Sequence, residues 1–216
     1  MSLLVLAHMY HVYADGQYEP ALREHVEALV NHGLMSNLTF FGVGLVGSER
    51  NRAEAMGCLA EYGLYPDVLV SASEGYEQLT LEAVKRYAGA HEDARILYAH
   101  TKGASNPSDI NIAWRSSMCY HNVVRWRDQV DALDAYDVAG CHWLDLEQYG
   151  HSTDFGAYSY FGGTYWWANA NYVNTLPPLD YGDRWGAEQW IGTNPTVRAY
   201  DANPGWPAFE LFTTRW

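Results

Sequence analysis

The sequence predicts an α/β fold with a mainly parallel sheet flanked by helices. Short apolar runs alternate with amphipathic segments through the first two thirds of the chain. Strands that alternate with helices in this way form parallel sheets that are covered on both faces. The length of 216 residues suits one domain with a full core. We therefore expect a single domain over residues 1–216.

Apolar runs and helix-boundary residues mark the first two strand–helix units. Leu3–Ala7 is the first apolar run, and Pro20 then stands at a favourable helix start. In that helix one apolar face repeats at helical spacing, and Gly33 fits the position of a C-terminal cap. The second strand is expected over 38–47, followed by a helix that Ser48 opens.

The later elements follow from the same patterns. The helix opened by Ser48 stops at Gly63. The remaining elements are expected as strands over 67–72, 95–100 and 136–143 and as helices over 75–87 and 112–133. The rest of the chain holds most of the tryptophans and many glycines. We expect this aromatic-rich C-terminal part to close one side of a cleft.

The composition excludes several classes of partner. The formal net charge is -13, so nucleic acid and anionic membranes are not expected as partners, although a local pocket can still take a small anion.

Cys58, Cys119 and Cys141 are widely spaced and odd in number, which argues for a reducing compartment. The apolar start is too short for a membrane span and carries no basic segment before it. We expect a soluble, cytoplasmic protein.

Polar side chains gather where the predicted strands end. Ligands of doubly wound sheets bind beyond the carboxyl ends of the strands, and segments 8–13, 71–77 and 100–105 fall there. At 100–103 the apolar run Ile96–Ala99 ends abruptly in His-Thr-Lys-Gly, which uses one of the two lysines of the chain. A Walker-type phosphate loop is absent from the sequence. Spacing alone favours a solvated loop lysine at this position.

Several segments resemble a known family in chain order. "ILYAHTKG", "DVAGCHW", "FGGTYWWANANYVNTLP" and "RWGAEQW" are similar to blocks of bacterial and phage glycosyltransferase-like proteins, including relatives of the rhamnan-synthesis type. "YHVYADG" and "EGYEQLTLEAV" look similar as well. The resemblance implies a GT-A-like (Rossmann-like) fold and a hexosyltransferase-type activity. Such an enzyme takes a nucleotide-sugar donor and transfers its sugar to a hydroxyl of a glycan, a lipid-linked glycan or a protein.

The sequence departs from the pattern of many GT-A enzymes at the end of the fourth predicted strand. Those enzymes carry an Asp-x-Asp motif there, which holds a divalent metal against the donor diphosphate. This chain has His100, Thr101 and Lys102 instead. The resemblance implies that Lys102 supplies a fixed positive charge in place of a metal, so no cofactor is expected, with Mn²⁺ or Mg²⁺ as the alternative. Gly103 would let the backbone approach the ligand.

The resemblance also implies roles for other residues. His11 and Tyr13 match positions near the nucleotide, and Glu77 matches an acidic donor-site position whose simpler role is to begin a helix. Together with His100, Lys102 and Gly103 they form the expected donor site. Glu188 matches the general base that deprotonates the acceptor, and a glutamate on a helix surface is the alternative.

The acceptor site is expected at Gly163, Trp166, Trp167 and Arg184. Consecutive strand residues point to opposite faces, so one of the two tryptophans should pack in the core and the other should line the site. The alternative is that both are structural.

A metal site is a further candidate feature of the segment after the fifth predicted strand. Asp145, Glu147 and His142 carry oxygen and nitrogen ligands close together in sequence. A solvated loop is the alternative there.

Two other functional classes remain open. A sugar- or nucleotide-binding protein that has lost activity would explain the missing Asp-x-Asp motif. A glycoside hydrolase would need two carboxylates across a cleft, for which Asp145 and Glu188 are the candidates.

Overall fold

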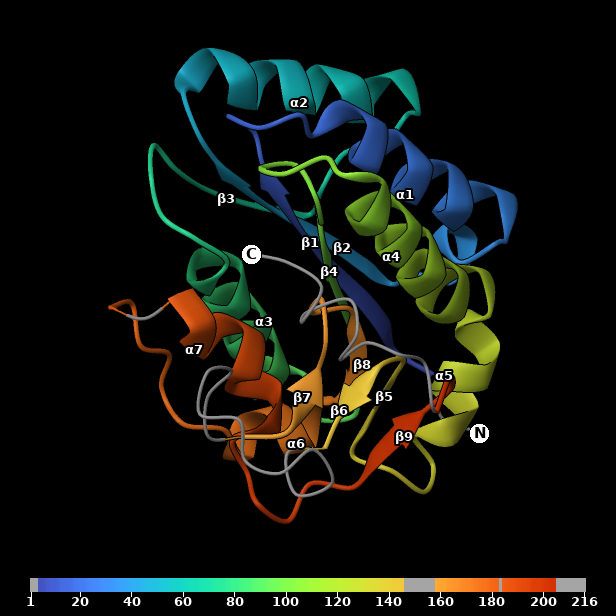
Figure 1. Cartoon of the computed structure of the whole chain (residues 1–216). Coiled ribbons are helices and arrows are strands. Elements are labelled where there is room, and N and C mark those ends of the chain that lie inside the picture. The colour runs from blue at the N-terminus through green and yellow to red at the C-terminus, as the bar shows by residue number, and fades with distance from the viewer. Residues whose placement is uncertain (1–3, 146–157, 183, 205–216) are drawn as a thin grey trace.

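A seven-stranded sheet forms the centre of the computed structural model, which describes residues 4–145, 158–182 and 184–204. The strand order is β3-β2-β1-β4-β8-β5-β9 (Figure 1). Strand β8 runs antiparallel to both of its neighbours, and the other neighbouring pairs are parallel. The prediction of a mainly parallel sheet flanked by helices is therefore confirmed.

The sheet strands alternate with helices along the chain, as the apolar runs predict. The strands are β1 (Leu6–Tyr13), β2 (Phe40–Val46), β3 (Val68–Ala72), β4 (Arg95–His100), β5 (Val138–Gly140), β8 (Trp166–Asn169) and β9 (Ala199–Asp201). A small second sheet pairs β6 (Trp143–Leu144) with β7 (Tyr160–Phe161). The helices are α1 (Glu19–Asn31), α2 (Glu49–Glu61), α3 (Gln78–Ala90), α4 (Asp109–Cys119), α5 (Trp126–Ala132), α6 (Ala170–Thr175) and α7 (Arg184–Gln189). Shorter helical segments are η1 (Met35–Asn37), the π-helix η2 (Tyr120–Val124) and η4 (Trp190–Gly192).

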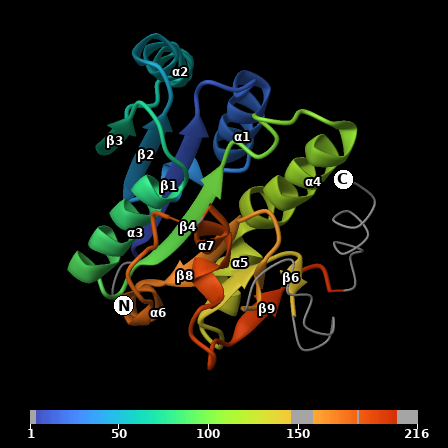
Figure 2. The same ribbon diagram turned by 60° about the vertical axis from the view of Figure 1, so that its left-hand side comes forward.

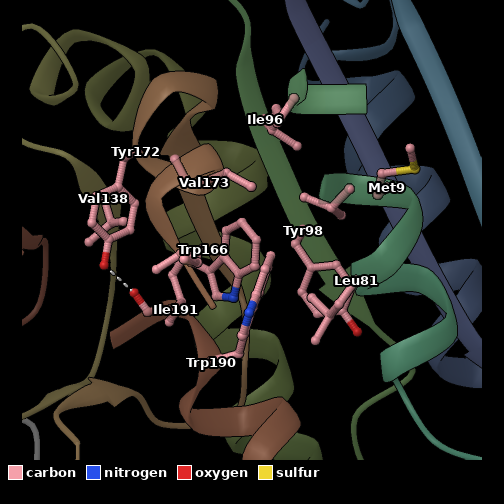
Figure 3. Packing of buried hydrophobic residues seen from close by; sticks show 14 of the residues in the cluster. Met9, Leu81, Ile96, Tyr98, Val138, Trp166, Tyr172, Val173, Trp190 and Ile191 are labelled. Carbon is pink, nitrogen blue, oxygen red and sulfur yellow. Dashed lines mark hydrogen bonds between the residues drawn. The ribbon is translucent and has the colours of Figure 1, made fainter. Parts of the chain in front are cut away.

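Alternate residues of the strands face two cores on opposite sides of the sheet. Ala7 and Met9 of β1 pack with α3, α6 and η4, and Figure 3 shows Met9 near Leu81 and Tyr98 in this core. Tyr10 and Val12 face the other side, where α1, α2 and α4 cover the sheet (Figure 2). The period of two along β1 thus places its side chains in both cores.

The predicted first strand, 3–7, is wrong in its extent, because β1 runs on to Tyr13. Its polar residues stay inside the strand because they have buried partners. His8 Nδ1 donates to the Leu97 carbonyl at 3.1 Å, and His8 Nε2 lies 2.8 Å from His25 Nε2. His11 Nδ1 lies 2.8 Å from Thr80 Oγ1.

The predicted helix over 112–133 is interrupted by the π-helix η2. Inside η2, Asn122 Nδ2 donates to the Met118 carbonyl at 3.0 Å, and the Asn122 carbonyl accepts from Trp167 Nε1 at 2.9 Å. These side-chain bonds take backbone carbonyls that a regular helix would use, so the ladder is broken there.

The predicted strand over 136–143 is split between β5 and β6. His142, at the break, has a φ of 65°. The backbone N–H groups of His142 and Trp143 donate to the Asp201 carboxylate, both at 3.0 Å. The chain therefore leaves the central sheet after β5, and the segment that takes the next sheet position is β8, whose two tryptophans were expected on a strand but whose place in the sheet was not predicted.

Gly44 of β2 provides a test of the packing between β2 and α3. A Cβ atom at Gly44 would lie 1.8 Å from Thr80 Oγ1, so Gly44→Ala must displace the residue that holds His11. We expect urea unfolding to show a loss of about 1–3 kcal/mol in the free energy of unfolding. Gly57→Ala in α2 is the matched control, because nothing lies within 4 Å of the added Cβ and the alanine should stabilise the helix by about 0.5–1 kcal/mol. The same sign of effect in both variants would contradict this packing.

Candidate functional site

The carboxyl ends of β1 and β4 lie side by side, and their loops are joined. His11 pairs with His100 in the parallel register. Thr101 N–H donates to the His11 carbonyl, and Tyr13 N–H donates to Thr101 Oγ1, both at 2.9 Å. These contacts place His11, Tyr13, His100 and the following Lys102 at one edge of the sheet.

Glu77 and His100 form a hydrogen-bonded pair at this edge. Glu77 Oε1 lies 3.0 Å from His100 Nδ1, and Glu77 Oε2 accepts from the Tyr98 hydroxyl at 3.0 Å. The other ring nitrogen, His100 Nε2, donates to the Gly163 carbonyl at 2.8 Å. The sequence places Glu77 and His100 far apart, and the pairing therefore ties the start of α3 to the turn before β8.

Charges around Glu77 keep its carboxylate ionised. Burial raises the pKa of Glu77. Three neighbours outweigh this effect and lower the pKa to about 2: His100 through its charge and its hydrogen bond, His11 through its charge, and Tyr98 through its hydrogen bond. Burial also lowers the pKa of His11, to about 4, against the opposing charge of Glu77. His11 is therefore neutral at physiological pH and gains its charge only in acid, in the range where Glu77 takes up its proton. At physiological pH Glu77 carries a negative charge that His100 faces directly.

Lys102 is half-buried just beyond His100. Its Nζ lies 4.2 Å from the centroid of the Trp114 ring. Across the described ranges, no carboxylate comes within ion-pair distance of this ammonium group. The next residue, Gly103, has a φ of 83°, which favours glycine. Within the described part of the chain, the loop thus presents a cation without an acidic partner.

Glu188, on α7, is buried close to the same cluster. Only 8% of the residue is exposed, and its Oε2 has no hydrogen-bond partner among the described residues. Its charge contributes, after burial and the nearby Glu77, to the raised pKa of Tyr98. A buried carboxylate oxygen without a partner is costly, and such groups are found where a water, an ion or a ligand completes the site.

Tyr160 is a neighbour of Glu188 that sequence reasoning missed. It lies on β7, against which α7 packs, and its hydroxyl is buried without a hydrogen-bond partner in the part of the chain that the structure describes. Burial, and then the charge of Glu188, raise the pKa of Tyr160. No local sequence pattern marks this tyrosine, because its contact with the surroundings of Glu188 depends on where α7 packs.

The predicted acceptor residues are placed differently from one another. Gly163 lies at the site. It has a φ of 86°, and its carbonyl accepts the hydrogen bond from His100 Nε2. Trp166 and Trp167 face opposite sides of the sheet as expected, but both are buried, at 1% and 0% exposure. Neither indole is open to a sugar, so the expectation that one lines an acceptor site finds no support in their placement. Arg184 begins α7, and its side chain lies outside the described residues.

The candidate metal residues do not form a described metal site. His142 is buried, its Nε2 lies 3.2 Å from Ser117 Oγ, and burial followed by the charge of His121 lowers its pKa to about 4. Asp145 ends the first described range, and Glu147 lies outside the described residues. Among the described residues, no three His, Cys, Asp or Glu side chains are grouped to hold a metal ion.

Two surface hollows lie away from this cluster. One, of about 660 Å³, is lined by Arg95, Asp137 and Asn169 among others, near the amino ends of β4 and β5. The other, of about 670 Å³, includes Phe40 and Tyr87. Neither is lined by a residue of the predicted site. No helix in the described ranges combines the length and apolar character needed to cross a bilayer.

A family model covers most of this architecture. The model described as a domain of unknown function, DUF8361, matches residues 22–183, which is well over half of the chain. The chain belongs to the DUF8361 family. No curated protein matches it. Because the description of DUF8361 assigns no activity, the resemblance to proteins of the rhamnan-synthesis type stays a prediction.

Solved structures resemble the DUF8361 chain in fold at low sequence identity. The 4-diphosphocytidyl-2C-methyl-D-erythritol synthase of Anaerococcus prevotii DSM 20548 superposes with a TM-score of 0.52 and 8% identity, over 95% of this chain and 90% of that one. Rv0371c of Mycobacterium tuberculosis H37Rv gives 0.45 and 13%, over 94% and 89%. The galactosyltransferase LgtC with donor and acceptor sugar analogues gives 0.43 and 11%, over 95% and 94%. The first likeness supports the predicted GT-A-like fold, and the other two score too low to argue from.

The Glu77–His100 pair predicts how stability depends on pH. The pKa of Glu77 is about 2 in the folded chain against an ordinary 4.5, so its stabilisation is present above pH 4.5 and is lost as the pH falls toward 2. Glu77→Gln should cost roughly 3 kcal/mol at pH 7 and flatten this acid limb. Urea unfolding between pH 7 and pH 3 measures both effects. Glu74→Gln, on an exposed residue of the same connection, should change neither, and an unaltered acid limb in Glu77→Gln would contradict the pairing.

Proposed function

We propose that this DUF8361 chain is a glycosyltransferase that moves a sugar from a nucleotide-sugar donor to an acceptor hydroxyl. The observation that carries the proposal is Lys102, a cation at the carboxyl end of β4 that no carboxylate of the described residues pairs with, in a chain of net charge -13. Open α/β sheets bind ligands at this edge, and an ammonium group is a competent phosphate partner.

The donor would lie across the ends of β1 and β4. Lys102 would face the diphosphate and stabilise the negative charge that develops on it as the bond to the sugar breaks. Because this charge is permanent, we propose that no metal is required. The other donor-side residues are His11, Tyr13, Glu77, His100 and Gly103. The synthase that shares the fold is named for a diphosphocytidyl compound, which supports a nucleotide as the class of ligand.

Glu188 would act on the acceptor. Its Oε2 has no protein partner in the described ranges and so is available to accept the proton of an attacking hydroxyl. The acceptor hydroxyl belongs to a glycan, a lipid-linked glycan or a protein side chain. The sugar would then leave the diphosphate and form its new bond to that oxygen.

Nucleotide binding tests the role of Lys102. Thermal unfolding is measured with a panel of nucleotide sugars and nucleoside diphosphates, in EDTA and then in manganese. One ligand should raise the Tm selectively, and the rise should persist in EDTA. A ligand at about 100 times its Kd stabilises by about 2.7 kcal/mol. Lys102→Gln should weaken that ligand about tenfold or more. Lys85→Gln, at the only other lysine, should not, because the Lys85 ammonium is engaged by the Leu176 carbonyl.

Each other outcome of that experiment contradicts part of the proposal. Equal affinity of the Lys102→Gln variant would remove Lys102 from the donor site. A shift only with manganese would overturn metal independence and direct attention to His142 and Asp145. A folded sample that no donor stabilises, but that cleaves glycans, would favour the hydrolase.

Turnover tests the role of Glu188. Once a donor is found, Glu188→Gln should lower kcat by roughly 10²–10⁴-fold and leave the donor Kd within about twofold. The matched control is Glu92→Gln, on an exposed residue at the amino-end hollow. Unchanged kcat in Glu188→Gln would exclude it as the base. Donor binding without turnover in the parent chain would instead identify a binding protein.

A further inference from the structure

Two consecutive residues of α4 contact the two ends of Lys102. The Trp114 ring lies 4.2 Å from the Lys102 ammonium, and Arg115 Nη1 donates to the Lys102 carbonyl at 3.1 Å. Trp114 and Arg115 are themselves buried, at 4% and 6% exposure. The backbone carbonyl and the ammonium group of the half-buried Lys102 therefore both contact the same helix, α4.

The guanidinium of Arg115 is anchored on its other side by α1. Its Nε and Nη2 both lie 2.8 Å from Glu24 Oε2, and Ser116 Oγ donates to Glu24 Oε1 at 2.7 Å. The planar fork of arginine can hold a carboxylate and a carbonyl at the same time, which a lysine cannot do in this geometry. Arg115 thus ties the loop after β4 to α1 and leaves Lys102 as the cation that faces the edge.

Trp114 also joins Lys102 to the Glu77–His100 pair. A Cβ atom at Gly163 would lie 3.1 Å from Trp114 Cε2, so the turn before β8 rests on the indole. The carbonyl of that same Gly163 accepts from His100 Nε2. In the loop itself, a Cβ atom at Gly103 would lie 3.6 Å from Arg115 Nη1. The indole is therefore in contact with Lys102 and is linked to His100 through Gly163.

We infer that Trp114 and Arg115 are positioning residues that preset Lys102 as the anion-binding cation of the site. An aromatic face attracts an ammonium group without neutralising it and leaves N–H donors for a ligand, whereas a carboxylate would cancel the charge. Ordering the side chain before binding also lowers the entropy cost that the ligand must overcome. The inference rests on the proposed function for its ligand class, a diphosphate.

The two-lysine composition allows a test that needs no ligand. In protein labelled with ¹³Cε-lysine, NMR should show two lysine signals, one from Lys85 and one from Lys102. The Trp114 ring current should shift the Lys102 signal upfield. Trp114→Leu should abolish the shift, Trp114→Phe should keep part of it, and Lys85 should not move in either variant. A Lys102 signal that is the same in all three proteins would overturn the positioning role of Trp114.

Pyrophosphate binding by calorimetry tests the consequence for a ligand. Trp114→Leu should weaken binding by about 2- to 30-fold, the range expected for a cation–π contact, and should have no further effect in a Lys102→Gln background. Trp126→Leu is the matched control, because Arg127 lies 4.3 Å from the Trp126 ring in the same kind of contact away from the site. Equal losses in both backgrounds would show a structural effect and overturn the inference.

Arg115 is tested by a substitution that keeps its charge. Arg115→Lys should weaken pyrophosphate binding and broaden the Lys102 signal, because one ammonium group cannot hold Glu24 and the Lys102 carbonyl together. Arg198→Lys is the control, since Arg198 holds Asp137, just before β5, through an exposed ion pair away from the site. No change in Arg115→Lys would exclude its role. If Trp114→Leu fails to fold, Trp114→Phe and Arg115→Lys decide the outcome.

If Lys102→Gln alone leaves pyrophosphate binding unchanged, the proposed function loses its donor-site cation. The ring-current measurement still decides whether Trp114 positions Lys102, so the two failures are distinguishable.

Discussion

The hydrogen bonds of His100 hold the candidate site together. One ring nitrogen faces the Glu77 carboxylate at the start of α3, and the other donates to Gly163 in the turn before β8. The His100 carbonyl accepts in addition from the Tyr165 hydroxyl at 2.5 Å. One strand-end residue therefore connects a helix on one face of the sheet, the central strand β4 and the entry to β8. Without it, Glu77 would be a largely buried negative charge whose remaining partner among the described residues is the Tyr98 hydroxyl, which is unfavourable.

This constraint explains how an acidic chain can present a cationic edge. The charges of Glu77 and Glu24 are each taken up by a partner inside the protein, through His100 and Arg115. Lys102 is left with an aromatic neighbour instead of an acidic one. Two of the carboxylates near the end of β4 are thus compensated by direct partners, whereas no carboxylate among the described residues pairs with the Lys102 ammonium group, so a local cation can persist in an acidic molecule.

The elements with clear apolar runs could be predicted from the sequence, and those that depend on distant partners could not. Strands β2, β3 and β4 fall inside their predicted ranges because each is a short apolar run. β1 was placed too early because its histidines are polar, and only the fold supplies their buried partners. β8 was expected as a strand only at its two tryptophans, and its position between β4 and β5 could not be predicted, since its burial comes from neighbours on both sides.

The candidate site shows the same division. The grouping of His11, His100 and Lys102 followed from the rule that parallel strands end at one edge. The contact of Glu77 with His100 agrees with the expected donor-side cluster. The roles of Tyr160 and Trp114 could not be predicted, because neither lies in a motif and each acquires its neighbours from a different part of the chain.

The position of β8 has a consequence for the order in which the chain acquires its structure. β8 lies between β4 and β5 and is the partner of both, yet it follows both in the sequence. A ribosome that has made β1 to β5 has therefore produced the sheet β3-β2-β1-β4 with an open edge at β4, and β5 as a strand without a sheet partner, because its neighbours β8 and β9 both come later. The sheet and β5 join only when Trp166–Asn169 has emerged and paired with each of them. Such long-range closure is slow relative to local pairing, so the open edges of β4 and β5 are the part of the nascent chain most in need of protection from aggregation.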